Sequence, residues 1–309
     1  LPERGAHAGW ETITSADGAL LERRKEDLTN IADNASVSGS LSWTPPSGVV
    51  ANLNGRVGIY QFDRKEISKT FPVGGLEGRR QFLSGEDEWN AEFGGDYEFG
   101  FGPGRLKAIG LVRRENSPVK DSVRIGAVDG SDFSETRFSQ TVDEGEYIGR
   151  GEYAWATGQG RDWQVSVENA FNFLDAEAGL SIAQDSQPFE IIPLPGANSR
   201  VEETRWEAAI THGRALTEAL RLQVSLGAEY SELTQSGDNT NAREFTRPKG
   251  FVSLSWQADP KLKLTARLDR EVGQLDFFDF ISSVNLNADN GNSGNAEIVP
   301  QQAWKWSLQ

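Results

Sequence analysis

Residues 89–101, WNAEFGGDYEFGF, decide the fold class of this chain. Apolar or small residues fill every second position from Trp89 to Phe101, and polar residues or glycine fill the positions between them. A period of two places successive side chains on opposite faces of a β-strand, so the two faces of this strand meet different surroundings. Segments 220–230 and 261–269 alternate in the same way and predict two further strands.

Weaker alternation extends this pattern over most of the chain. It runs through 37–43, 51–60, 147–155, 163–173, 206–210 and 252–256. Segment 106–113 is ambiguous because Ile109 and Leu111 break the alternation, and the best helical candidate, 214–222, fits a turn that enters a strand. The sequence therefore predicts an all-β fold with about ten or eleven strands.

The connections between these strands alternate between short and long. Short connections of turn composition lie at 44–48, 102–104, 158–162, 212–218 and 258–260, where Gly and Pro are frequent. Long polar segments lie between them, at 63–88, 115–146, 175–203, 231–247 and 274–300. This order predicts an antiparallel up-and-down sheet with tight turns at one end and large loops at the other.

Aromatic residues gather at the two ends of the predicted strands. One group lies beside the short turns: Trp43, Phe101, Trp155, Trp163 and Trp256. The other lies at the long-loop ends: Tyr60, Trp89, Tyr147, Phe173, Trp206 and Tyr230. Two aromatic belts, alternating faces and unequal connections are typical of a transmembrane β-barrel, which must close because lipid leaves no partner for unpaired edge amides. We expect a barrel wall in contact with lipid, in the cell outer membrane of a Gram-negative bacterium.

Composition excludes several classes of function. The net charge is −15, with 46 Asp and Glu against 31 Lys and Arg, which argues against a nucleic-acid partner. The chain has no Cys, no Met and only two His. This composition excludes thiol nucleophiles and cysteine metal sites and argues against a His-based catalytic triad. We expect no enzyme activity, no catalytic residue, no metal site and no cofactor. The absence of Met fits a segment of a longer protein.

The region after Arg270 carries a recognisable order of residues. A Phe-rich stretch, 277–280, precedes Asn295, Ile298, Pro300 and Gln301, and aromatic residues follow at Trp304 and Trp306. This order resembles that of the TonB-dependent outer-membrane receptors. Members of that family commonly have a segment of the type Asn-Pro-x-Leu-x-Pro-Glu that leads from a large loop back into the barrel wall. Here Ala296 replaces the first proline and Gln301 replaces the glutamate.

The resemblance implies a particular architecture and activity. It implies that residues 1–309 are the N-terminal half of a 22-stranded barrel, an incomplete wall whose plug domain and C-terminal strands are absent. It also implies active uptake of a scarce solute, such as a siderophore, a vitamin or a carbohydrate, with the TonB complex acting through the plug. A passive outer-membrane porin and a soluble all-β carbohydrate-binding protein remain alternatives.

The same region supplies the candidate residues for binding a small molecule or an oligosaccharide. Phe277, Phe278, Asp279 and Phe280 suit an aromatic and acidic platform near the top of the lumen, although packing at the base of the loop or a place in the aromatic girdle explains them somewhat better. Asn285 and Asn287 lie in an oxygen-rich stretch. The glycine there does not match a calcium-loop pattern, which favours a turn over a metal site.

Overall fold

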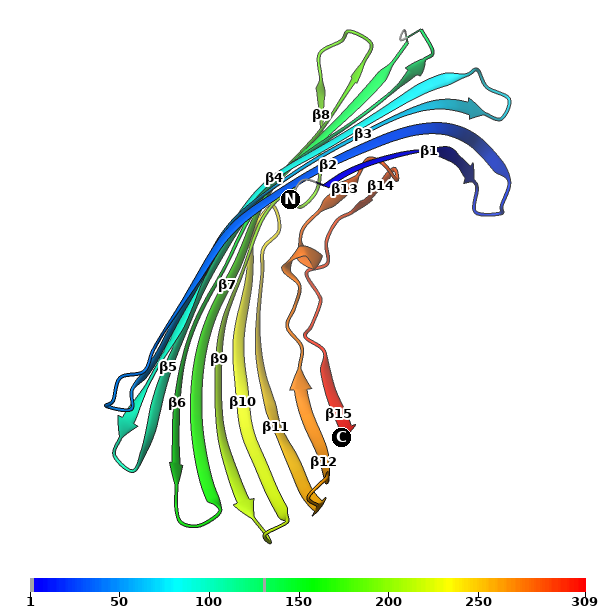
Figure 1. The fold of residues 1–309 in the computed structure, drawn as a ribbon. Helices are drawn as coiled ribbons and strands as arrows, with labels where there is room; N and C mark the ends of the chain where they lie inside the picture. The colour runs from blue at the N-terminus through cyan, green and yellow to red at the C-terminus, as the bar shows by residue number, and fades with distance from the viewer. Residues whose placement is uncertain (1–2, 130–131) are drawn as a thin grey trace.

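A computed structural model describes residues 3–129 and 132–309 as one large curved β-sheet (Figure 1). The sheet has 13 strands, and each strand in it pairs antiparallel with the next, except that the short β8 (Glu190–Ile192) pairs only with β7 (Arg161–Gln184). Among the described residues β1 (Glu3–Thr14) and β15 (Gln302–Leu308) form the two open edges, and β13 (Ser283–Asn285) and β14 (Asn290–Asn292) form a separate small sheet. The prediction of an all-β, antiparallel up-and-down sheet is confirmed.

The strands are longer than the sequence pattern indicated. The elements are β1 (Glu3–Thr14), β2 (Leu20–Trp43), β3 (Val50–Pro72), β4 (Gly78–Phe101), β5 (Gly104–Ala127), β6 (Ser134–Ala156), β7 (Arg161–Gln184), β8 (Glu190–Ile192), β9 (Asn198–Ala215), β10 (Leu220–Gly237), β11 (Asn241–Asp259), β12 (Leu262–Val272), the 3-10 helix η1 (Phe277–Phe280), β13 (Ser283–Asn285), β14 (Asn290–Asn292) and β15 (Gln302–Leu308). No described helix is long and apolar enough to cross a membrane.

Most of the predicted long loops are wrong in their extent. Segment 63–88 is chiefly the upper halves of β3 and β4, joined at 73–77, and 115–146 is chiefly β5 and β6. Strand β1 was also missed. Backbone hydrogen bonds continue the ladder whatever the side chains are, whereas the alternation that reveals a strand is lost where both faces are polar. Among the connections that are fully described, only 185–197 and the one from β12 to β15 remain long and mostly outside the main sheet.

The strand register gives the sheet one apolar and one polar face. On the convex face Phe93 is opposite Gly55 and Val112, and the side chains of Trp89, Phe93 and Tyr97 are exposed. On the concave face charged side chains pair across strands: Glu168 accepts from Arg150 at 3.3 Å and from Arg205 at 3.2 Å. The alternation predicted from the sequence is therefore a difference between two faces of one wall.

The register corrects one assignment to the aromatic belts. Tyr60 lies opposite Asn34 on one side and Glu88 on the other, which places it on the concave polar face. Ile59, its neighbour, takes the convex position opposite Trp89. Because opposed residues of an antiparallel pair share a face, Tyr60 does not belong to the outer aromatic belt.

Gly250 tests how tightly the strands approach one another. Its φ is +151°, and a Cβ there would lie 2.3 Å from the carbonyl oxygen of Ser225 on β10. We expect Gly250→Ala to destabilise the sheet by about 1–3 kcal/mol, because the backbone must move. The urea midpoint, followed by tryptophan fluorescence, measures this. Gly39→Ala is the matched control, since a Cβ at Gly39 meets nothing within 4 Å; equal effects of the two changes would contradict the expectation.

Candidate functional site

Residues 273–301, here called the inner segment, run from β12 to β15 along the concave side of the sheet (Figure 1). The amide of Gly273 donates to the carbonyl of Gln301 at 2.8 Å and closes the base of the segment. Asp276 caps η1 by accepting from the Phe278 amide at 2.9 Å. Farther along, Asn285 Oδ1 accepts from the amides of Asn287 and Ala288, both at 3.0 Å, and shapes the tip between β13 and β14. Local hydrogen bonds thus define the course of the segment.

Two apolar side chains fix the inner segment to the sheet. Ile281 is 1% exposed and packs with Val142, Leu174 and Ala176 of β6 and β7. Phe280 is 3% exposed and packs with Val201 of β9 and Leu233 of β10. These contacts form the two buried apolar clusters described for the chain, and both are where the segment meets the wall.

Polar side chains of the wall bind the backbone of the inner segment. Gln140 Nε2 donates to the Ser282 carbonyl at 2.9 Å, and Gln235 Nε2 donates to the Phe280 carbonyl at 3.2 Å. On β11, Asn241 Nδ2 donates to the Ala296 carbonyl at 3.0 Å and Arg243 Nη1 to the Ile298 carbonyl at 3.2 Å. The segment is thus held by strands β6, β10 and β11 as well as by its own ends.

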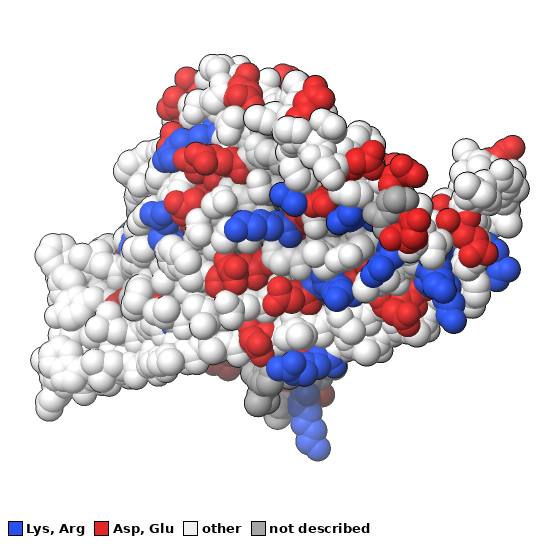
Figure 2. Space-filling view, turned by 90° about the horizontal axis from the view of Figure 1, so that it is seen from above, with Lys and Arg blue, Asp and Glu red and all other residues white. Residues whose placement is uncertain are grey.

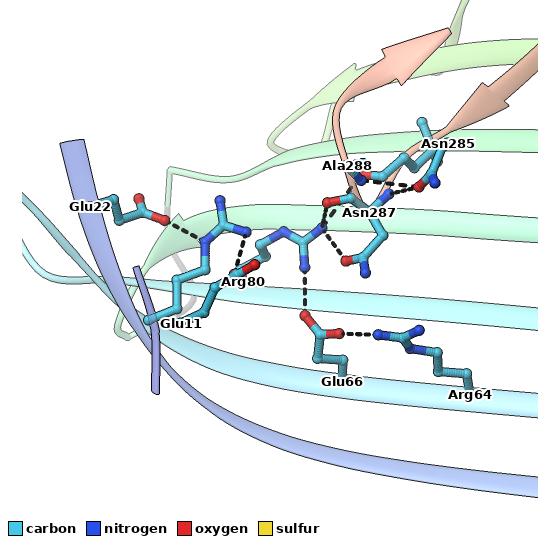
Figure 3. A network of polar contacts seen from close by, with 10 residues as sticks. Glu11, Glu22, Arg64, Glu66, Arg80, Asn285, Asn287 and Ala288 are labelled. Atoms are coloured by element: carbon cyan, nitrogen blue, oxygen red, sulfur yellow. Dashed lines mark hydrogen bonds and ion pairs between the residues drawn. The ribbon is translucent and has the colours of Figure 1, made fainter. Parts of the chain in front are cut away.

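Arg80 of β4 binds the tip of the inner segment and a neighbouring carboxylate, an arrangement here called the Arg80 clasp (Figure 3). Its Nη2 donates to Asn287 Oδ1 at 2.9 Å and to the Asn287 carbonyl at 3.2 Å. Its Nη1 pairs with Glu66 of β3 at 2.8 Å, and Arg64 pairs with the other oxygen of Glu66 at 2.8 Å. The side chains of Arg80 and Glu66 are 3% and 4% exposed, so each needs the other to offset the loss of water.

Acidic groups crowd the upper end of the wall beside this clasp. Burial, a hydrogen bond with Glu11 and the charges of Glu66 and Glu11 raise the pKa of Glu26 to about 7, although Arg24 opposes the shift. Seen from above, Asp and Glu interleave with Lys and Arg over this end of the molecule (Figure 2). This end of the molecule therefore presents a mixed, ion-paired surface.

A cavity of about 240 Å³ lies where the base of the inner segment meets the wall. Its polar wall comes from β5, β6, β7 and β9, and Gln274–Phe277 of the segment lie across it. Residues that line it include Arg113, Glu115, Glu144, Glu146, Asn172, Glu203 and Asp276. Burial, followed by the charge of Glu115, raises the pKa of Glu144 above its ordinary value. The geometry suits a small ligand with positive charge.

The predicted binding residues take different places around this site. Phe277 lines the cavity, whereas Phe280 is buried against the wall and Phe278 is 46% exposed. The backbone carbonyl of Asp279 accepts from the Asn295 amide at 2.7 Å. Asn285 and Asn287 lie at the tip, as a turn and as the partner of Arg80. Their role in ligand binding stays a prediction, and no described cluster of His, Asp or Glu could hold a metal ion.

The residues that carried the family resemblance lie where the inner segment returns to the sheet. Asn295 Oδ1 accepts from the Glu297 amide at 3.0 Å, Ile298 packs against the cluster around Phe280, and Pro300 is buried. Gln301 directly precedes β15. Sequence reasoning missed the roles of Arg80, Glu66 and Glu203, which lie in stretches expected to be loops; a charged residue in a polar part of a strand gives no signal of burial.

Several solved structures are similar to this chain. The siderophore receptor PiuA from Acinetobacter baumannii is 9% identical with a TM-score of 0.49, and the match covers 98% of this chain and 54% of that one. The copper transporter OprC is 14% identical with a TM-score of 0.44, covering 91% and 52%. The hemophore receptor HasR from Serratia marcescens, solved with its hemophore HasA and heme, is 10% identical with a TM-score of 0.43, covering 100% and 50%.

This chain spans about half the length of each of these proteins. No protein-family model and no curated protein sequence matches it. At such identities and TM-scores the likeness assigns neither a ligand nor an activity to this chain.

Replacing Arg80 tests the clasp. Arg80→Gln leaves Glu66 buried without its full counter-charge, at a cost of about 3–5 kcal/mol, and frees the tip at Asn287. We expect faster amide hydrogen exchange across 283–292. Arg79→Gln is the matched control, because Arg79 is the adjacent, exposed residue on the same strand. Unchanged exchange in Arg80→Gln would show that the tip is held by other contacts.

The raised pKa of Glu26 predicts a pH dependence of stability. Between about pH 4.5 and pH 7 the folded chain binds more protons at this group than the unfolded chain does. Its contribution is therefore complete below pH ~4.5 and is lost as the pH rises through ~7. We expect Glu26→Gln to reduce the fall in urea midpoint between pH ~5 and pH ~8.5. Asp27→Asn, on the opposite face, should keep the full fall; an unaltered fall in Glu26→Gln would exclude Glu26 as its source.

Proposed function

We propose that this chain is part of the wall of a TonB-dependent outer-membrane receptor that imports a scarce solute. One observation carries the proposal: an exposed apolar face with aromatic residues near both of its limits backs a concave face of paired charges. A soluble sheet exposes few large apolar side chains together, whereas here Trp43, Trp304 and Trp306 are 54%, 66% and 74% exposed. Lipid is the surrounding that stabilises such a face.

The height of the apolar face supports its contact with a membrane. On β4 it extends from Trp89 to Phe101, about 12 steps of roughly 3.3 Å each. At the tilt of about 45° found in membrane barrels, that length spans ~28 Å, close to the ~25 Å apolar band of such barrels. The longer upper halves of β3–β7 would then project beyond the membrane on the side of the inner segment.

The inner segment favours a receptor over a passive porin. It is packed on the concave face through Phe280, Ile281 and the Arg80 clasp, in space that a passive pore leaves to water. By the family resemblance, energy would come from the TonB complex acting on the plug of the whole protein. The work of the chain is binding and passage, with no covalent chemistry.

Growth of the source bacterium tests the proposal. The gene that contains this chain should be required for growth on a limiting solute, and deleting tonB should abolish that growth to the same extent. The protein should fractionate with the outer membrane. Growth that depends on the gene but persists without tonB would favour the porin, and recovery of the full protein from the soluble fraction would favour the carbohydrate-binding alternative.

A charge placed on the apolar face tests the membrane contact directly. Phe93, which is 56% exposed on the convex face, lies within the proposed band. We expect Phe93→Arg to lower the stability of the inserted protein by about 2–4 kcal/mol, seen as a lower urea midpoint in lipid vesicles. Asn54→Arg on the concave face of neighbouring β3 is the matched control and should have little effect. Equal tolerance of both changes would argue against lipid at the convex face.

A further inference from the structure

Four residues of the cavity form a row across adjacent strands. The register aligns Arg113 of β5 with Glu146 of β6, Glu146 with Asn172 of β7, and Asn172 with Glu203 of β9. All four line the cavity beneath the base of the inner segment. Neighbouring strands are about 4.8 Å apart, so the backbones of Glu146 and Glu203 are separated by about 10 Å, with Asn172 between them.

Glu203 is the unusual member of this row. It is 6% exposed and lines the cavity, yet among the described residues it has no hydrogen-bond or ion-pair partner. The side chain is nearly enclosed while it lines the cavity, and charges in such places in folded proteins are generally paired. The Oδ1 atom of Asn172 beside it also has no hydrogen-bond partner. The site holds acceptors that the protein itself does not satisfy.

Neighbouring cations have partners other than Glu203, although the Nε atom of Arg205 has none. Arg205, two residues along β9, donates to Glu168 at 3.2 Å, and the amide oxygen of Gln274, oriented to face it, accepts from Arg205 Nη2 at 3.2 Å. Arg113 pairs with Glu115 at 3.0 Å. The cavity is therefore lined by five carboxylates and a single guanidinium that is bound to one of them.

The spacing selects the kind of cation. A single metal ion draws its oxygen ligands to within roughly 2.6 Å of one point. Among the described residues, no group of three or more His, Asp or Glu side chains converges in that way, at this cavity or elsewhere. The volume of about 240 Å³ and the apolar side chains of Leu275 and Phe277 leave room for a short carbon chain.

We propose that this cavity binds a small organic ammonium ion, whose charged group is held by Glu203 and whose carbon chain lies against the base of the inner segment. Binding of this ion does not depend on the proposed function. The further step, that this ion is the imported solute, rests on the proposed function. Glu146, at the other end of the row, binds the second charge of a diamine.

Binding of cadaverine, a five-carbon diamine, tests the assignment. Isothermal titration of the purified protein that contains this chain, in detergent near neutral pH, should show saturable binding. Glu203→Gln should weaken it by ~10-fold or more, the loss expected for one charge-assisted hydrogen bond. Glu146→Gln should weaken cadaverine binding but leave binding of pentylamine nearly unchanged. Glu177→Gln, an exposed charge on β7, is the matched control and should bind like the unaltered protein.

Three results would overturn the proposal. They are no binding of cadaverine, equal binding in Glu203→Gln, or equal binding of the neutral pentanediol. If calcium binds, cadaverine does not, and Glu203→Gln abolishes the calcium binding, the cavity is a metal site. Far-ultraviolet circular dichroism of each variant separates loss of the site from loss of the fold.

Transport and binding fail independently. If cadaverine binding depends on Glu203 but growth is independent of tonB, the ammonium site is supported and the proposed receptor function is contradicted. If growth depends on TonB but cadaverine does not bind, the receptor function is supported and the ammonium site is contradicted.

Discussion

Register of antiparallel pairing is the constraint on which the rest of this structure depends. Side chains alternate with a period of two, so a slip of one residue between neighbouring strands would exchange the two faces. Because the register holds from β2 to β11, Phe93, Val112 and Tyr147 share the convex face. Glu168, Glu207 and Glu229 align on the concave face, beside Arg150 and Arg247. One geometric rule thus supplies both a surface suited to lipid and a charged interior wall.

The inner segment adds what the sheet alone lacks, an apolar core. The wall is one layer thick, and the two buried apolar clusters of its described residues form where Phe280 and Ile281 pack against it. Arg80 secures the far end through a buried ion pair, whose charges must be paired to be tolerated. The cavity beneath Gln274–Phe277 is therefore a consequence of the way in which the segment docks.

Stability and function place opposite demands on the charges of the concave face. Most are paired across strands, as Arg247 and Lys249 are with Glu229, both at 3.2 Å. Glu203 departs from this rule, and such departures in an otherwise paired wall are where a ligand can supply the missing partner. Glu26 departs from it differently, because burial, a hydrogen bond with Glu11 and the charge of Glu66 raise its pKa at the upper end of the wall.

The sequence alone determined the strand character and the two faces wherever one face is apolar, as in 89–101, because period two is a local property. It also located the return to the sheet before Trp304. It did not determine the upper halves of β3–β6, where polar residues are frequent on both faces. There only the backbone hydrogen bonds between neighbouring strands reveal the strands. The ambiguous Ile109 and Leu111 face Arg150 and Ile148 across the register, a placement that no local pattern contains. The Arg80 clasp and the Glu146–Asn172–Glu203 row join residues distant in the chain, so only the tertiary structure, by aligning strands, decided them.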